Sequence, residues 1–156
     1  MTAEQCVGVI SDTHGLLRDE VRSALEGCDL ILHAGDIGSL EVLEALKGIT
    51  HVVAVRGNVD RQRWSEGLNE TEELQADGKR ILIIHELRRM KTDPVQSGID
   101  IVVYGHSHQP DIRITKGVLY LNPGSAGPRR FGLPVCLALL RLKGGKAYPE
   151  IIEITV

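Results

Sequence analysis

The amino-acid sequence predicts an α/β domain in which two β-sheets pack together and helices flank them. Three observations favour this class. Continuous aliphatic runs alternate with helical patterns in the first part of the chain, which is typical of βαβ units. Glycine-containing turns separate extended runs in the last part, which is typical of antiparallel hairpins. The 156 residues, 42% of them hydrophobic, suit one domain with a substantial core, and we expect residues 1–156 to form it.

The first part of the chain contains three expected strands and two expected helices. The strands are residues 6–11, 29–34 and 51–55. Their unbroken apolar character is typical of strands that are covered on both faces. One helix is expected over residues 18–28, where apolar side chains recur on one face. The other is expected over residues 39–48, with Ser39 as its N-cap and Gly48 as its end.

The rest of the chain is expected to be mainly β-structure. Hairpins are predicted over residues 71–86, 111–121 and 137–156, with turns at Asp77-Gly78, Lys116-Gly117 and Gly144-Gly145. At most a short helix over residues 93–98 precedes a strand over residues 101–104. The last segment, residues 150–156, mixes apolar and polar positions, which indicates a strand at the edge of a sheet.

Composition narrows the classes of partner. The net charge of −3 provides no basic surface for a nucleic acid, and the aromatic content of 3% is too low for base-stacking platforms. A nucleic-acid substrate therefore stays open but has no support from charge. The N-terminal residues lack the pattern of a secretory signal, and no apolar run is long enough to span a bilayer. We expect a cytoplasmic protein that has no membrane partner.

Polar side chains follow five of the expected strands at the point where each ends. In chain order they are Asp12, His14, Asp36, Asn58, His85, His106 and His108. Each short motif, taken alone, is more often a turn or a helix cap than a ligand. The ordered set is different, because ligands bind where the carboxyl ends of strands converge in α/β sheets. Carboxylate, amide oxygen and imidazole are ligands for Mn, Fe, Zn or Ni, so the set predicts a metal site.

The order D-x-H, G-D, G-N, H, G-H-x-H resembles the calcineurin-like metallophosphoesterase family over nearly the whole chain. The stretches Val55–Asp60 and Asn122–Ser125 are similar to the "VRGN-x-D" and "NPGS" motifs of the small YfcE-type bacterial and archaeal phosphodiesterases. The resemblance implies a four-layer α-β-β-α sandwich of two mixed sheets flanked by helices. It also implies two divalent ions, with Mn²⁺ expected and Ni²⁺, Fe²⁺ or Zn²⁺ as alternatives.

Carried over by position, the resemblance divides the ligands between the two ions. One ion would be held by Asp12, His14, Asp36 and His108, and the other by Asp36, Asn58, His85 and His106. Asp36 and Asn58 are accordingly the expected catalytic residues of a phosphodiesterase in which a hydroxide shared by the metals attacks phosphorus in line. Arg129 and Arg130 are candidates for substrate binding, although an ordinary turn with solvated arginines is an equal alternative.

Two positions depart from the family pattern. Val59 stands where many relatives carry a histidine that acts as a general acid, so we expect slow turnover of alkyl esters and faster turnover of aryl esters. Glu86 stands where relatives carry glycine after the ligand histidine. We expect its side chain to point to solvent; the alternative is that it leans toward the metals and weakens catalysis. His33 and His51 are expected to be structural, because neither is placed at the carboxyl end of a strand.

Three functions remain open on this reading. The leading one is a metal-dependent phosphodiesterase that acts on a small phosphodiester. The second is an interaction scaffold that keeps the fold and has lost turnover. The third is a phosphomonoesterase or nuclease with the same metal centre. The sequence leaves the physiological substrate and the metal identity open, and the β-rich C-terminal part offers a surface for a homodimer.

Overall fold

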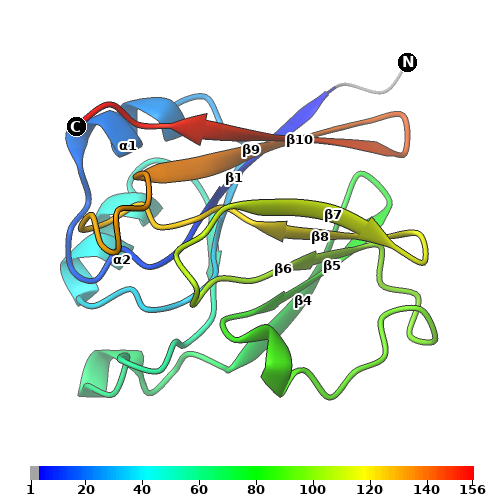
Figure 1. Cartoon of the computed structure of the whole chain (residues 1–156), viewed down its shortest axis with the longest axis horizontal. Coiled ribbons are helices and arrows are strands. Elements are labelled where there is room, and N and C mark those ends of the chain that lie inside the picture. Colours follow the sequence, from blue (N-terminus) through cyan, green and yellow to red (C-terminus); the bar gives the residue numbers. More distant parts are fainter. Residues whose placement is uncertain (1–3) are drawn as a thin grey trace.

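The computed structural model describes residues 4–156 and contains two five-stranded mixed sheets packed face to face (Figure 1). The first sheet has the order β10-β9-β1-β2-β3 and the second the order β4-β5-β6-β8-β7. The strands of the first sheet are β1 (Gln5–Ile10), β2 (Leu30–His33), β3 (Val52–Ala54), β9 (Cys136–Lys143) and β10 (Lys146–Glu153). Those of the second are β4 (Thr71–Ala76), β5 (Lys79–Ile84), β6 (Ile101–Val103), β7 (Asp111–Thr115) and β8 (Val118–Asn122). The predicted fold class and the edge position of the last strand are confirmed.

Two α-helices cover the outer face of the first sheet, α1 (Asp19–Leu25) and α2 (Leu40–Lys47). Ser39 is the predicted N-cap of α2, and its hydroxyl accepts a hydrogen bond from the Val42 amide. Val21, Leu25 and Leu46 from these helices pack with Ile31 of the sheet. Neither helix is long and apolar enough to cross a membrane, and the same holds for every helix within residues 4–156.

The main core lies between the two sheets. Val9 and Leu32 of the first sheet pack there against Ile83, Val103 and Leu121 of the second, and all five are buried. Burial on this scale contributes about 1.5–3 kcal/mol for each large aliphatic side chain. Aliphatic residues therefore build the core, as the scarcity of aromatic residues requires.

The outer face of the second sheet has a thinner cover than the first. Leu82, Val102 and Tyr104 pack there against Leu87 and Met90. These last two residues belong to or follow the 3₁₀ helix η2 (Leu87–Arg89), and the segment at 93–98 forms a turn rather than a helix. Within residues 4–156 this fourth layer is thus a loop with one 3₁₀ turn, because the connection between β5 and β6 places Pro94 and Gly98 where a helix would have to continue.

The direction of the strands brings many loops to one end of the molecule. β1, β2 and β3 are parallel to one another, and so are β5, β6 and β8. Backbone hydrogen bonds join the loops beyond these strands, such as Asp12 N to Gly35 O (3.0 Å), His14 N to Asp36 O (2.9 Å) and Gly105 N to His85 O (3.0 Å). A further bond, from Ala126 N after β8 to Ser11 O after β1 (3.0 Å), joins the two sheets at this end, so the carboxyl ends of strands from both sheets meet.

Candidate metal centre

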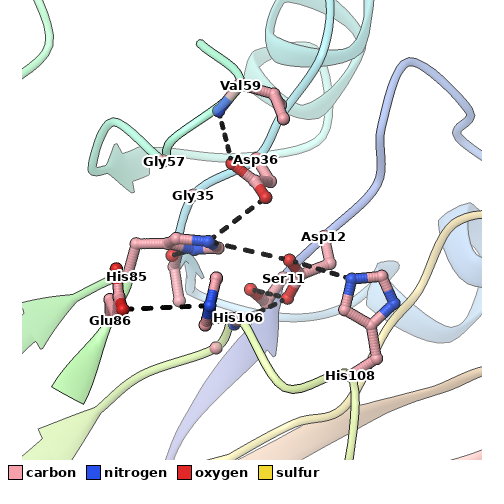
Figure 2. A network of polar contacts seen from close by, with 12 residues as sticks. Ser11, Asp12, Gly35, Asp36, Gly57, Val59, His85, Glu86, His106 and His108 are labelled. Atoms are coloured by element: carbon pink, nitrogen blue, oxygen red, sulfur yellow. Dashed lines mark hydrogen bonds and ion pairs between the residues drawn. The ribbon is translucent and has the colours of Figure 1, made fainter. Parts of the chain in front are cut away.

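Three imidazoles, those of His14, His85 and His108, converge with two carboxylates where the strand ends meet. Figure 2 shows His85 and His108 beside Asp12 and Asp36. Asp12 Oδ1 lies 3.7 Å from His14 Nε2, 3.9 Å from His85 Nε2 and 3.4 Å from His108 Nε2. Asp36 Oδ2 lies 3.7 Å from His14 Nε2 and 3.2 Å from His85 Nε2. Two triads, Asp12–His14–His108 and Asp12–Asp36–His85, place their ligand atoms within 4.8 Å of one another. These contacts are too long for most to be hydrogen bonds, and they leave room for a cation.

Several of these atoms are buried without a partner. Asp12 Oδ1, His14 Nε2 and His108 Nδ1 make no hydrogen bond with the described residues. Burying a polar atom unpaired costs about 1–3 kcal/mol, so such atoms are rarely gathered in one place without a ligand. The donor set therefore fits a divalent metal such as Mn, Fe, Zn or Ni.

In Asp12, Asp36 and His85 the second oxygen or nitrogen is already held by a neighbour. Asp12 Oδ2 accepts hydrogen bonds from the Ser11 hydroxyl (2.6 Å) and the His106 amide (3.2 Å). Asp36 Oδ1 accepts one from the Val59 amide (3.0 Å). His85 Nδ1 lies 2.7 Å from Ala34 O and donates to it, which leaves the lone pair on Nε2 facing the carboxylates. The chain thus orients the free atoms of these three ligands toward the cluster.

Asn58 completes this side of the cluster. Its side-chain oxygen faces His85 Nε2 at 3.0 Å and the two carboxylate oxygens of Asp36 at 3.1 and 3.2 Å. No hydrogen is available between these acceptors in that orientation. With its NH₂ group turned inward, Asn58 would donate to these acceptors, and with its oxygen inward it could hold a cation among them.

His106 lies at the exposed side of the cluster. Its ring centroid is 5.3 Å from that of His85, and 43% of its side chain is exposed. Its Nε2 faces Glu86 Oε1 at 3.9 Å (Figure 2). The expectation that Glu86 points to solvent is wrong, because only 12% of its side chain is exposed and it turns toward His106 while pairing with Arg88.

The cluster shifts the proton affinities of its members. Burial alone would raise the pKa of Asp12 and of Asp36, but the neighbouring imidazoles of His14 and His85 respectively hold each pKa below its usual value. Burial would lower the pKa of His85, yet the neighbouring Asp36 and Asp12 carboxylates raise it. For His108 burial prevails and lowers the pKa. A bound cation would replace the proton on His85, so metal binding and protonation compete here.

Two glycines allow the loops to approach closely. A Cβ on Gly57 would lie 2.1 Å from both the backbone nitrogen and Oδ1 of Asp36. A Cβ on Gly105 would lie 2.0 Å from the hydroxyl of Ser11, which holds Asp12. Any side chain at these positions would push apart the loops that carry the ligands.

The sequence reading missed three residues that position the site. The buried carboxylate of Asp60 accepts hydrogen bonds from the amides of Ile37 (3.1 Å), Gly38 (3.0 Å) and Gly57 (2.9 Å). It thereby ties the Asp36 loop to the Asn58 loop. In the sequence, Asp60 is the last residue of the "VRGN-x-D" stretch, which by itself indicated only a family resemblance.

The "NPGS" stretch supports the site through its side chains. Asn122 Nδ2 donates to the carbonyl of Gly105 (3.3 Å) and to Ser107 Oγ (3.1 Å), so it shapes the loop that carries His106 and His108. Ser125 Oγ donates to the backbone carbonyl of Asp12 (3.1 Å). In the sequence, the sign of this supporting role was the pair of polar residues Asn122 and Ser125 at and just after the end of a predicted strand.

The remaining candidates lie outside the cluster. Arg129 and Arg130 are exposed on the loop after β8, and Arg130 is close enough to His108 to help lower its pKa. The expectation that His33 is not at a strand's carboxyl end is wrong, since it closes β2. Its predicted structural role is supported, because its ring is buried, with Nε2 3.0 Å from Thr13 Oγ1 and Nδ1 accepting from the Gly35 amide.

A cavity of about 360 Å³ adjoins the cluster. It shares Asn58, His85 and Glu86 with the metal centre and extends away from it between the Asn58 loop and η2. A ligand bound at the metal-binding atoms can therefore reach into this cavity.

Comparisons with known proteins agree with this geometry. The model of the calcineurin-like phosphoesterase superfamily domain matches residues 6–145. A probable metallophosphoesterase of Methanothermobacter thermautotrophicus is 33% identical over 94% of this chain and 91% of its own. A phosphodiesterase of Methanocaldococcus jannaschii is 28% identical over 94% of this chain and 98% of its own. The chain belongs to the calcineurin-like phosphoesterase superfamily, as its motifs predicted.

Solved structures with the same fold include proteins of different named roles. The phosphoesterase Yfce of E. coli matches with a TM-score of 0.69 and 22% identity, over 87% of this chain and 88% of its own. Vacuolar protein sorting 29 of Cryptosporidium parvum matches with a TM-score of 0.76 and 24% identity, over 98% of this chain and 99% of its own. At these identities the likeness concerns the fold.

Proposed function

We propose that this protein is a metal-dependent phosphodiesterase that acts on a small phosphodiester. The observation that carries the proposal is the convergence of unpartnered, buried ligand atoms from Asp12, His14 and His108 beside Asp36 and His85. Membership of the phosphoesterase superfamily and the phosphodiesterase name of one relative support it. Two divalent ions, Mn²⁺ first among them, would be held by the seven predicted ligands.

The ions would supply two things: a lower pKa for the attacking water and neutralisation of charge on the phosphoryl oxygens. The chain's own residues prepare the site for this chemistry. Asp12 and Asp36 each use one carboxylate oxygen for backbone or hydroxyl donors and keep the other for the cluster. Asn58, at the mouth of the cavity, can turn its amide NH₂ group toward a substrate oxygen.

The leaving group receives no acid from the Asn58 loop. Val59 follows Asn58, its side chain is 38% exposed, and only its backbone amide contacts Asp36. A general acid contributes about 10²–10⁴-fold to such reactions. We therefore infer a preference for leaving groups that need no proton, such as phenolates.

The test is hydrolysis of bis(p-nitrophenyl) phosphate with added Mn²⁺, compared with hydrolysis of p-nitrophenyl phosphate. Metal-dependent diesterase activity that Asp36→Ala abolishes, together with its bound metal, supports the proposal. Asp77→Ala, which changes a carboxylate in a distant hairpin turn, is the matched control and should keep full activity. Faster hydrolysis of the monoester would make the protein a phosphomonoesterase instead.

A scaffold role is the second candidate, and one contact favours it. Glu86 turns toward His106 at the exposed side of the centre, where its negative charge opposes a phosphate. If the protein binds two ions but hydrolyses no phosphodiester, the scaffold is the better account. If Glu86 obstructs a working centre, Glu86→Gly should be faster than the parent in the same assay. The predicted homodimer and cytoplasmic location stay predictions.

A further inference from the structure

We infer that the cavity beside the metal centre is a subsite for a second phosphate group, so that the substrate is a small phosphodiester that also carries a terminal phosphate. The inference rests on the proposed phosphodiesterase function and names the class of substrate. It concerns a part of the molecule that holds none of the predicted substrate-binding arginines.

The cavity is built from three separate segments of the chain. Arg56 and Arg61 flank the Asn58 loop, and Arg89 comes from η2 on the other side. The full lining is Arg56, Gly57, Asn58, Asp60, Arg61, Glu70, Ile84, His85, Glu86 and Arg89. Three guanidinium groups thus surround a space of about 360 Å³, which is near the lower limit for small-molecule sites.

Arg61 is held in place by the metal-site loop itself. Its Nε donates a 2.9 Å hydrogen bond to the carbonyl of Asn58. The two terminal nitrogens of the guanidinium make no hydrogen bond within residues 4–156 and stay available. A guanidinium that is oriented in this way can bind two phosphate oxygens at once.

Arg56 and Arg89 lie on the same side of the cavity, where both face the carboxylate of Glu70. A terminal nitrogen of each lies 3.7 Å from Glu70 Oε1, which is longer than a hydrogen bond. The side chain of Glu70 is 58% exposed, so these two contacts are weak in water. A phosphate oxygen can therefore take the place that Glu70 holds between the two arginines.

The other carboxylates of the lining are already committed. Asp60 is buried and accepts three backbone hydrogen bonds. Glu86 pairs with Arg88, which does not line the cavity. The guanidinium nitrogens of Arg61 and Arg89 are thus not taken up by Asp60 or Glu86, and they can bind a terminal phosphate, which carries about −1.5 to −2 near pH 7.

The surroundings favour a phosphorylated sugar over a nucleobase in this cavity. Apart from the ligand His85, no aromatic side chain belongs to the lining. A base would find no stacking partner there. A small diester also fits the net charge of −3 better than a polynucleotide does.

The experiment compares two esters that differ only in the second phosphate. Thymidine 5′-(p-nitrophenyl phosphate) has a free 3′-hydroxyl, and its 3′-phosphorylated form carries the terminal phosphate. With Mn²⁺ present, kcat/KM for p-nitrophenol release should be about tenfold or more higher for the 3′-phosphorylated ester, because charged hydrogen bonds add to binding. The double variant Arg61→Gln/Arg89→Gln should lose this preference, so that its kcat/KM values for the two esters become equal.

Arg63→Gln is the matched control. Arg63 is exposed in the same stretch of chain and lies outside the cavity, so its variant should keep the preference. A wild-type protein that hydrolyses both esters equally well, with no change in the double variant, overturns the subsite and leaves the phosphodiesterase function intact.

A binding measurement separates the two proposals. Calorimetry with the Mn²⁺-loaded protein should give thymidine 3′,5′-bisphosphate an affinity about tenfold or more above that of thymidine 5′-monophosphate, and the double variant should remove the difference. If neither ester is hydrolysed but this difference is present and depends on the arginines, the phosphodiesterase fails and the subsite stands. Equal affinities in the wild type contradict the subsite.

Discussion

The two ends of the sheets use the same unusual backbone conformation for different purposes. Among residues 4–156, eight non-glycine residues have φ between 48° and 75°. Two of them, Asp77 and Lys116, begin tight hairpin turns and are each followed by a glycine that also has positive φ. Five others are predicted metal ligands: Asp12, His14, Asp36, His106 and His108.

The left-handed residues form turns at the hairpin end and position side chains at the metal-site end. At the hairpin end, two successive left-handed residues are what a two-residue turn requires. Lys116 is exposed there, and the half-buried Asp77 accepts a hydrogen bond from the Gly145 amide (3.3 Å). At the metal-site end, the ligands themselves turn left-handed directly after a strand, at about 1–3 kcal/mol each. Backbone hydrogen bonds such as Asp12 N to Gly35 O hold them there. This backbone conformation directs the predicted ligand side chains from neighbouring strands toward one another.

The largest expected effect comes from filling the space at the metal-site end. In Gly57→Ala the new Cβ would meet Asp36 N and Oδ1 at 2.1 Å, so we expect a loss of unfolding free energy on the order of 3 kcal/mol. Gly78→Ala, in the β4–β5 turn, has no heavy atom within 4 Å and should lose only about 1 kcal/mol from its left-handed φ. Urea unfolding measures both, and equal losses would mean that the loops are not closely packed.

A pH-dependent effect of similar size is expected from His33. Burial lowers the pKa of His33 to about 4, whereas an unfolded histidine titrates near 6.5. Because the unfolded chain takes up the proton first, stability is complete above pH 6.5 and falls by about 3 kcal/mol as the pH drops to 4. Protonation of Nδ1 would also break its bond from the Gly35 amide.

The check is unfolding by urea between pH 7.5 and 4.5 in the presence of EDTA. His33→Gln should have a flatter dependence than the wild type over this range, whatever its stability at pH 7.5. His51→Gln is the control from the opposite end of the parallel strands, where His51 is exposed before β3, and it should follow the wild type. A parallel decline in all three proteins would contradict the assignment.

A smaller gain is expected from supplying the leaving group with an acid. Val59→His keeps the backbone amide that contacts Asp36 and adds an imidazole at a position that is 38% exposed. Hydrolysis of alkyl phosphodiesters should rise about tenfold, and that of aryl esters should hardly change. Val95→His, on an exposed turn over the second sheet, is the control. An equal gain on both kinds of ester would show that the imidazole does not act on the leaving group.

The smallest expected effect is on the unfolding free energy when a left-handed residue at either end is replaced by glycine. Lys116→Gly relieves a left-handed residue at the hairpin end, and after the entropy of the unfolded chain is counted it should gain roughly 0.5 kcal/mol. His106→Gly should gain a similar amount in EDTA, because its side chain is 43% exposed. Only His106→Gly should weaken binding of Mn²⁺, measured by calorimetry. A loss of stability in both variants would mean that the left-handed conformation costs nothing.

Much of the fold and site could be predicted because the signals are local. Aliphatic runs, the Ser39 cap and the Asp77-Gly78 turn each lie within a few residues, and strand polarity then brings the loops that carry the predicted ligands to one end of the sheets. The direction of Glu86 could not be predicted, since it depends on His106 twenty residues later. The arginine-lined cavity was missed for the same reason: Arg56, Arg61 and Arg89 meet only after the two sheets pack together.

Asp60 accepts hydrogen bonds from three backbone amides, and these bonds hold part of the proposed metal site in place before a metal binds. The Asp60 carboxylate joins the two loops that carry the predicted ligands Asp36 and Asn58, so these loops are held together by the chain itself. A metal would then bind to loops that are already in place. A chelator should therefore remove bound metal without unfolding the protein, in contrast to a zinc finger.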